Sequence, residues 1–177
     1  MDDLKSIARR AMLDHGLQPD FSAQALAQTS AITQPPSDSA VRDLRELLWA
    51  SIDNDDSQDL DQLSVAEPLA GGAVKILVAI ADVDATVKIG TPIDDHARAN
   101  TTSVYTAAQV FPMLPEKLST NLTSLADGQE RVSLVIEMTI DPDGKLTGSD
   151  IYRADREVWM NHINTQHKLR RFVSRLL

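Results

Sequence analysis

Hydrophobic positions recur with a helical period at the start of the chain. Residues 2–15 carry apolar side chains three and four apart, which predicts an amphipathic helix that ends at Gly16. A second short helix is predicted for residues 22–28. Residues 29–40, which contain Pro35 and Pro36, follow as a linker. We therefore expect an N-terminal helical arm and linker over residues 1–40.

From residue 47 the pattern changes to one typical of strands. Residues 47–52 and 72–81 are apolar, the second range being rich in β-branched side chains. Residues 131–141 alternate between apolar and more polar positions and end in the turn sequence Asp-Pro-Asp-Gly, so residues 145–153 should return as a hairpin partner. Short helices are expected at residues 92–99 and 114–119.

Composition sets the class of protein. The chain has 177 residues and 42% hydrophobic residues, enough to build a core. It has no cysteine, which excludes disulfides and thiolate metal sites. No run of eighteen apolar residues occurs, and the first residues are acidic, so we expect neither a membrane span nor a secretory signal. A cytoplasmic protein is the interpretation that follows, and the sequence indicates no particular oligomeric state.

Charge is distributed unevenly about a net value of −9. Residues 1–150 carry 11 Lys and Arg against 24 Asp and Glu, whereas residues 151–177 carry 6 against 2. The acidic part would repel RNA unless cations intervene. Residues 155–177 are interpreted as a basic helix. It either packs on the domain or contacts RNA directly through Arg170 and Arg171.

The most distinctive motif is SIDNDDSQDLDQL, residues 51–63. Five carboxylates lie within nine residues directly after the apolar run at 47–52; they are Asp53, Asp55, Asp56, Asp59 and Asp61. Such crowding is unfavourable unless cations neutralise it, and oxygen ligands suit Mg²⁺. A solvated acidic loop and a calcium-binding loop are the alternatives. An EF-hand does not fit, because the glycine at its sixth position is missing.

This motif resembles the signature of the ribonuclease II/R family, commonly T-I-D-x(5)-D-x-D-D. Further segments resemble that family in the same order: VAIADVDATVKIGTPID at 78–94, TSVYTAAQVFPMLPEKLS at 102–119, NLTSL at 121–125 and IYRA at 151–154. The resemblance covers about residues 43–154. It implies a partial catalytic domain, of the kind called RNB, over residues 41–154, with residues 155–177 atypical of the family. We expect an α+β fold, with a β-rich, partly barrel-like core of antiparallel hairpins, flanking helices and the N-terminal arm.

The resemblance also implies roles for individual residues. Asp53, Asp59 and Asp61 match three of the four family aspartates around a magnesium ion, Asp61 being the one most critical to catalysis. The fourth falls on Gln62, which can still offer a carbonyl oxygen but adds no charge. Tyr105 matches a tyrosine that stacks on RNA near its 3′ end, a half-buried strand residue being the alternative.

Two further positions carry expectations of their own. Asp82 is expected to fix backbone geometry near the site rather than to perform chemistry. Asn100 stands where family members often have arginine. Because the family domain continues beyond the resemblance, we also expect exposed core surface, and aggregation or a need for a partner.

Two functions follow from the resemblance. The first is a Mg²⁺-dependent exoribonuclease that degrades single-stranded RNA from 3′ to 5′ and releases nucleoside 5′-monophosphates, with neither DNA nor membrane as a partner. The second is an inactive remnant with at most a binding role. Gln62 and the missing later part of the family domain favour the remnant, whereas the intact aspartates favour the enzyme.

Overall fold

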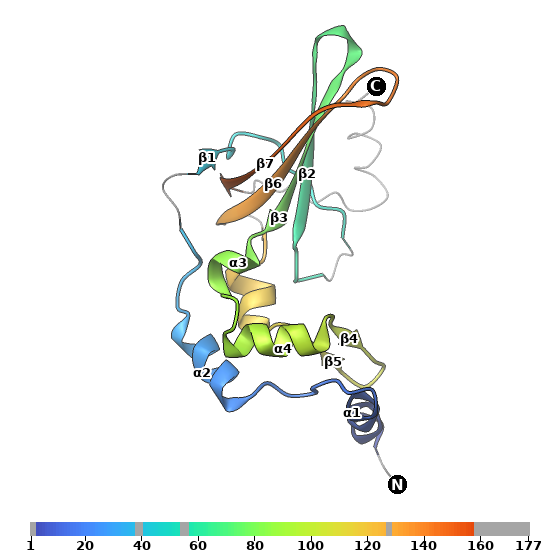
Figure 1. Cartoon of the computed structure of the whole chain (residues 1–177), viewed down its shortest axis with the longest axis vertical. Coiled ribbons are helices and arrows are strands. Elements are labelled where there is room, and N and C mark those ends of the chain that lie inside the picture. The colour runs from blue at the N-terminus through green and yellow to red at the C-terminus, as the bar shows by residue number, and fades with distance from the viewer. Residues whose placement is uncertain (1–2, 38–40, 54–56, 127–128, 158–177) are drawn as a thin grey trace. The chain divides into compact units, whose positions relative to one another are not determined.

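A computed structural model describes residues 3–37, 41–53, 57–126 and 129–157, the side chains of residues 155–157 excepted (Figure 1). Two packing units are present. The helical unit comprises the described parts of Met1–Gln34 and Val83–Leu122, and the sheet unit comprises the described parts of Pro35–Asp82 and Thr123–Leu177. The elements are a mixture of helices and antiparallel strands, which confirms the predicted α+β class.

The sheet unit contains one five-stranded sheet in the order β1-β7-β6-β3-β2. Its strands are β1 (Arg42–Asp43), β2 (Gln62–Pro68), β3 (Val74–Ala81), β6 (Glu130–Ile140) and β7 (Leu146–Glu157). The long hairpin strands β6 and β7 twist strongly, and the sheet curls as a half-barrel (Figure 1). The expected β-rich, partly barrel-like core of antiparallel hairpins is therefore confirmed.

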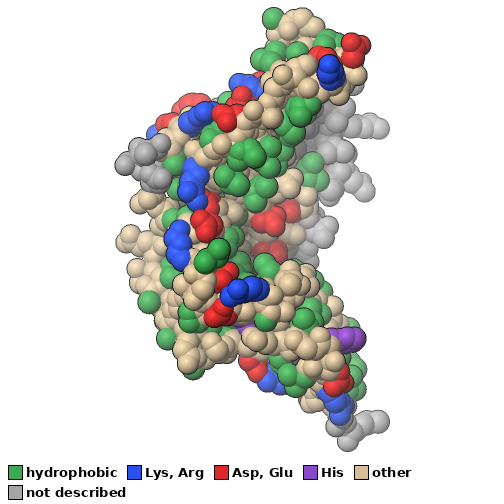
Figure 2. Space-filling view, viewed as in Figure 1, with side chains coloured by type: hydrophobic (Ala, Val, Ile, Leu, Met, Phe, Trp, Pro, Cys, Tyr) green, Lys and Arg blue, Asp and Glu red, His purple; other side chains and the backbone are tan. Residues whose placement is uncertain are grey.

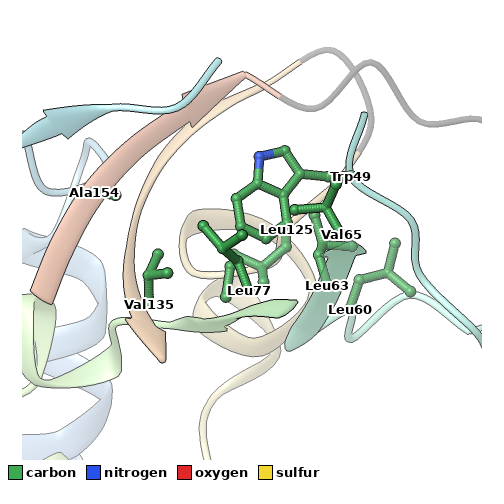
Figure 3. Close-up of a cluster of buried hydrophobic side chains, with 9 residues drawn as sticks. Trp49, Leu60, Leu63, Val65, Leu77, Leu125, Val135 and Ala154 are labelled. Carbon is green, nitrogen blue, oxygen red and sulfur yellow. The ribbon is translucent and has the colours of Figure 1, made fainter. Parts of the chain in front are cut away.

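Alternation of side chains gives the sheet one buried face. Leu63 and Val65 on β2, Leu77 on β3 and Val135 on β6 are buried and pack together. Three loop residues, Trp49, Leu60 and Leu125, complete this cluster (Figure 3). The indole N–H of Trp49 donates to the carbonyl of Leu44 at 3.1 Å, so its polar atom is satisfied inside the core.

The opposite face of the sheet is also apolar but is not buried. Ile80, Leu134 and Ile151 lie on neighbouring strands and are 36%, 38% and 63% exposed. Hydrophobic side chains are visible at the surface over the strands (Figure 2). The expected exposure of core-like surface is therefore present among the described residues.

Strand β1 joins the sheet at its edge through parallel pairing with β7, where Arg42 faces Ala154. The guanidinium of Arg42 lies 3.6 Å from the ring centre of Tyr152 and 3.0 Å from the carboxylate of Asp150. Tyr152 donates its hydroxyl to Glu137 at 2.8 Å. Burial and the neighbouring Glu137 carboxylate raise the pKa of the Tyr152 phenol to about 12, so the phenol stays neutral at physiological pH.

The helical unit contains α1 (Leu4–Asp14), α2 (Ala23–Ala31), α3 (Val83–Thr86), α4 (Pro92–Asn100) and a π-helical turn at Leu118–Leu122. A small hairpin pairs β4 (Val104–Tyr105) with β5 (Val110–Phe111). Asp3 and Ser22 cap α1 and α2 through their side chains, as expected for residues that satisfy free N–H groups. The core of the helical unit is formed by Ala25, Val87, Ile93, Leu114, Leu118 and Leu122.

Most sequence predictions of elements are confirmed, and four are corrected. Residues 47–52 form no strand but contain a single bridge at Ala50, because Trp49 enters the core from a loop while Leu48 and Ile52 are exposed. Helix α2 runs on to Ala31, into the predicted linker. The helix expected at residues 114–119 begins later, and its π-turn ends at Leu122. The first residues of the predicted basic helix, Asp155–Glu157, extend β7 instead, because they pair with the start of β6.

Other predictions fall outside the described residues. The remainder of the basic helix, with Arg170 and Arg171, belongs to this group. The division into domains after residues 40 and 154 stays a prediction. No helix in the part of the chain that is described has the length and apolarity to cross a membrane.

Candidate functional site

The acidic motif precedes a strand rather than following one. Residues Ser57–Asp61 form no regular element, and β2 begins at Gln62. Asp53 is half-buried, whereas Asp59, Asp61 and Gln62 are exposed. Residues 54–56, which include Asp55 and Asp56, lie outside the described residues.

Leu60 anchors the segment between the two exposed aspartates. Its side chain is buried in the core of the sheet unit. Its carbonyl accepts the N–H of Leu125 at 2.7 Å, and its own N–H donates to the hydroxyl of Ser124 at 3.3 Å. The apolar position within the D-L-D sequence thus fixes the backbone, while the carboxylates on either side face solvent.

The segment is also attached to the end of β3. The N–H of Ala81 donates to the carbonyl of Asp61 at 2.9 Å, and Gln62 faces Ile80 in the β2–β3 ladder. Gln62 therefore occupies the first position of a regular strand, with its amide exposed.

Asp82 follows β3 directly and has a buried carboxylate. It accepts the Nε–H of Arg153, on β7, at 2.6 Å. A buried carboxylate requires such a partner because desolvation penalises its charge. This pair connects the end of β3 to β7, which supports the view that Asp82 fixes the backbone beside the acidic segment.

Among the described side chains, no group of three or more His, Cys, Asp or Glu is gathered closely enough to hold a metal ion. Asp53, Asp59 and Asp61 are thus not brought together as a preformed triad. Magnesium does not require one, because it is commonly held by one or two carboxylates and completes its octahedral shell with water and substrate phosphate. Asp59 and Asp61, two exposed residues on either side of the anchored Leu60, offer the carboxylate ligands that this requirement names.

Tyr105 lies in β4 of the helical unit and is 68% exposed. Tyr105 is therefore a strand residue, as the alternative held, but it is exposed rather than half-buried. A ring with most of its surface accessible can stack on a base.

Asn100, the second departure from the family pattern, is buried at the end of α4. Its side chain forms two 2.8 Å hydrogen bonds with the backbone of Gln18: Oδ1 accepts the N–H, and Nδ2 donates to the carbonyl. The asparagine therefore attaches the N-terminal arm to α4, which no local sequence signal could have shown.

Sequence reasoning missed two residues beside the candidate site, Ser124 and Arg153. Both lie in segments that carry the family resemblance, NLTSL and IYRA, yet nothing in their local pattern distinguishes a residue that holds the acidic segment from an ordinary core or strand residue.

The class of domain is defined by a curled, mostly antiparallel sheet with an acidic segment fixed at the start of an edge strand. Residues 41–155 match the family model described as RNB domain, and the chain belongs to that family.

Similar proteins and solved structures support the assignment to the RNB family. The chain is 46% identical over 112 residues to ribonuclease R of Escherichia coli K12, a match that covers 63% of this chain and 14% of that protein. The structure of Mycoplasma genitalium RNase R in complex with ribose-methylated single-stranded RNA is similar with a TM-score of 0.80 and 28% identity, over 89% of this chain and 25% of that one. Yeast Ssd1, described as a pseudonuclease, shares the fold with a TM-score of 0.69 and 15% identity, over 89% of this chain and 20% of that one.

Proposed function

We propose that this chain carries the metal-binding part of an exoribonuclease active site, which hydrolyses single-stranded RNA from 3′ to 5′ into nucleoside 5′-monophosphates with Mg²⁺. The observation that carries the proposal is the family match over residues 41–155, which includes the whole acidic segment. The RNase R of M. genitalium was solved with single-stranded RNA, which supports RNA as the ligand class.

Each candidate residue has a defined task in this proposal. Asp53, Asp59 and Asp61 would hold the ion through carboxylate oxygens, with Gln62 offering its amide oxygen. When bound, magnesium supplies an activated water and stabilises charge that develops on the phosphate. Tyr105 would hold a terminal base by stacking, which is independent of base identity. Leu60 and the bonds around it keep Asp59 and Asp61 at the surface.

A specific observation favours a second candidate, a noncatalytic RNB remnant. The fourth family aspartate is Gln62, which is exposed at the start of β2 and adds no negative charge. The chain also spans 14% of E. coli ribonuclease R, so the whole protein's activity does not follow from the match. The fold alone is compatible with both candidates.

Incubating the chain with labelled poly(A) and Mg²⁺ separates the candidates. We expect nucleoside 5′-monophosphates from the wild-type chain, and product at the level of an EDTA-treated sample from Asp61→Asn. Asp143→Asn is the matched control, because Asp143 is an exposed aspartate in the turn between β6 and β7. It should retain wild-type activity.

Gln62→Asp sharpens the assay by restoring the family carboxylate. An added negative charge should strengthen Mn²⁺ binding and raise the rate of nucleotide release. If neither the wild-type chain nor Gln62→Asp binds Mn²⁺ or releases nucleotides, the enzyme proposal fails and the remnant is supported.

A further inference from the structure

We propose that Ser124 is a positioning residue, whose buried hydroxyl clamps the backbone on both sides of Asp59 and so holds the Asp59–Asp61 segment ready for a divalent cation. The inference deepens the proposed function and rests on it. It concerns a residue outside the acidic motif, more than sixty positions later in the chain.

The hydrogen bonds of Ser124 define the clamp. Its hydroxyl donates to the carbonyl of Gln58 at 3.0 Å and accepts the N–H of Leu60 at 3.3 Å. The carbonyl belongs to the peptide unit that precedes Asp59, and the N–H belongs to the one that follows it. A hydroxyl provides one donor and two acceptor positions, so a single oxygen serves both peptide units. The backbone dihedral angles of Asp59 are thereby restrained from both ends.

The same restraint continues through Asp61. The peptide unit between Leu60 and Asp61 is held by the bond from the Leu125 N–H, at 2.7 Å. The unit between Asp61 and Gln62 is held by the bond from the Ala81 N–H, at 2.9 Å. Both aspartates therefore lie between two anchored peptide units, although their residues belong to no strand.

This restraint has a purpose that a core contact alone would not serve. Neighbouring carboxylates repel each other, and an unrestrained loop would let them separate. The apolar contact of Leu60 fixes where the segment lies but leaves the orientation of its peptide planes open. Ser124 fixes the orientation, and it is only 1% exposed, so water does not compete for its hydroxyl.

Ser133 provides a matched control for a merely structural role. It is also fully buried in the sheet unit, and its hydroxyl donates to the carbonyl of Ala154 at 3.4 Å, between β6 and β7. Replacing either serine by alanine removes one buried hydroxyl. Only the change at Ser124 releases the acidic segment.

The test compares Ser124→Ala, Ser133→Ala and the wild-type chain by two measurements. Hydrogen exchange of the Leu60 amide, read without metal, reports the clamp. Calorimetric titration with Mn²⁺ reports the cation site. Since residues that orient metal ligands commonly contribute 10–100-fold to metal affinity, we expect Ser124→Ala to weaken Mn²⁺ binding by at least about tenfold and to speed Leu60 exchange. Ser133→Ala should change neither quantity.

A folded Ser124→Ala chain that binds Mn²⁺ as tightly as Ser133→Ala would overturn the positioning role. Should Ser124→Ala fail to fold, Ser124→Cys takes its place, because a thiol fills the site but bonds weakly. Unchanged Mn²⁺ affinity in that variant overturns the role equally. A wild-type chain that binds no Mn²⁺ removes the proposed function and the purpose of the clamp together, whereas Leu60 exchange still shows whether the clamp exists.

Discussion

The two units of this chain differ in the interactions that stabilise each of them internally. The sheet unit has long ladders around an apolar cluster that includes Leu63 and Val135, with buried polar groups such as that of Ser124 beside it. The helical unit has short elements around a smaller apolar core, and polar side chains attach its distant segments to one another through the backbone. Gln28 accepts the N–H of Ile93 at 3.0 Å, and Lys117 donates to the carbonyl of Thr29 at 3.0 Å. Asn100 binds both backbone groups of Gln18.

The difference shows how each unit would respond to change. An apolar core is damaged in proportion to the volume removed, because the cavity left behind collapses only partly. A polar attachment is damaged by the loss of one partner, because the hydrogen bonds that join the two segments are lost with it. Four predictions follow in order of expected effect.

The largest effect is expected from Leu77→Ala, at the centre of the sheet core. Leu77 is fully buried, so its truncation should lower the free energy of unfolding by roughly 2–5 kcal/mol. Urea unfolding followed by circular dichroism measures the change. The matched control is Ile151→Ala on the exposed face of the same sheet, with an expected change within about 0.5 kcal/mol. Equal losses in both variants would contradict the assignment of the two faces.

Asn100→Ala should have a smaller but still clear effect. It removes two hydrogen bonds to the backbone of Gln18, each worth about 0.5–1.5 kcal/mol net. The local measurement is hydrogen exchange of the Gln18 amide, which should accelerate. Gln24→Ala on α2 is exposed and should leave this exchange rate unchanged. A protected Gln18 amide in Asn100→Ala would show that other contacts hold the arm.

His96 should give the helical unit a pH dependence. Burial lowers the pKa of its imidazole, partly offset by the backbone of Pro112 and the charge of Asp20. Asn100 Nδ2 lies 3.1 Å from His96 Nε2 and can only donate to it. Protonation of His96 at Nε2 would therefore place two N–H donors against each other. The folded pKa is below the unfolded one. Stability is therefore complete above the unfolded value of 6.5 and is lost as pH falls through the folded value.

The measurement is the free energy of unfolding between pH 7.5 and 5. A single linked proton limits the slope to about 1.4 kcal/mol per pH unit. His96→Gln should remove this component of the slope, and His15→Gln, a change at an exposed histidine, should not. An unchanged slope in His96→Gln would assign the pH dependence to other groups.

The smallest effect on stability is expected from Ile151→Lys, on the exposed apolar face. Ile151 is 63% exposed, so the free energy of unfolding should change by no more than about 0.5 kcal/mol. Its effect should appear instead in association, because exposed apolar patches favour aggregation. Light scattering against concentration should decrease relative to wild type, and Lys145→Arg in the nearby turn should leave it unaltered. Unchanged scattering in Ile151→Lys would exclude this face as the cause of association.

Much of the fold could be predicted because its strongest elements carry a local period. Apolar residues recur at every second position of β6 from Val132 to Ile140, and a turn sequence follows that determines the hairpin with β7. Strand β2 was missed because its alternation, Leu63 and Val65, begins inside the acidic motif. The apolar run at 47–52 was predicted as a strand and is not one, because Trp49 enters the core from a loop.

Only those residues of the candidate site that lie together in one sequence segment could be predicted. The aspartates and Gln62 are contiguous with their motif, and the resemblance identified them. Ser124, Asn100 and Arg153 act across 64 or more positions of sequence, through one or two hydrogen bonds each, which leave no periodic pattern. Such partners become visible only when the chain is folded.

The pairing of β1 with β7 has a consequence for engineering. Arg42, near the start of the family-matched region, faces Ala154, near its end, so the two ends of that region leave the sheet from adjacent strands. Domains with neighbouring ends tolerate insertion into a host loop and relocation of their termini. Linkers attached at these two ends would therefore emerge at one point of the surface, but a graft must keep residues 1–34 as well, because Ala25 packs in the core of the helical unit.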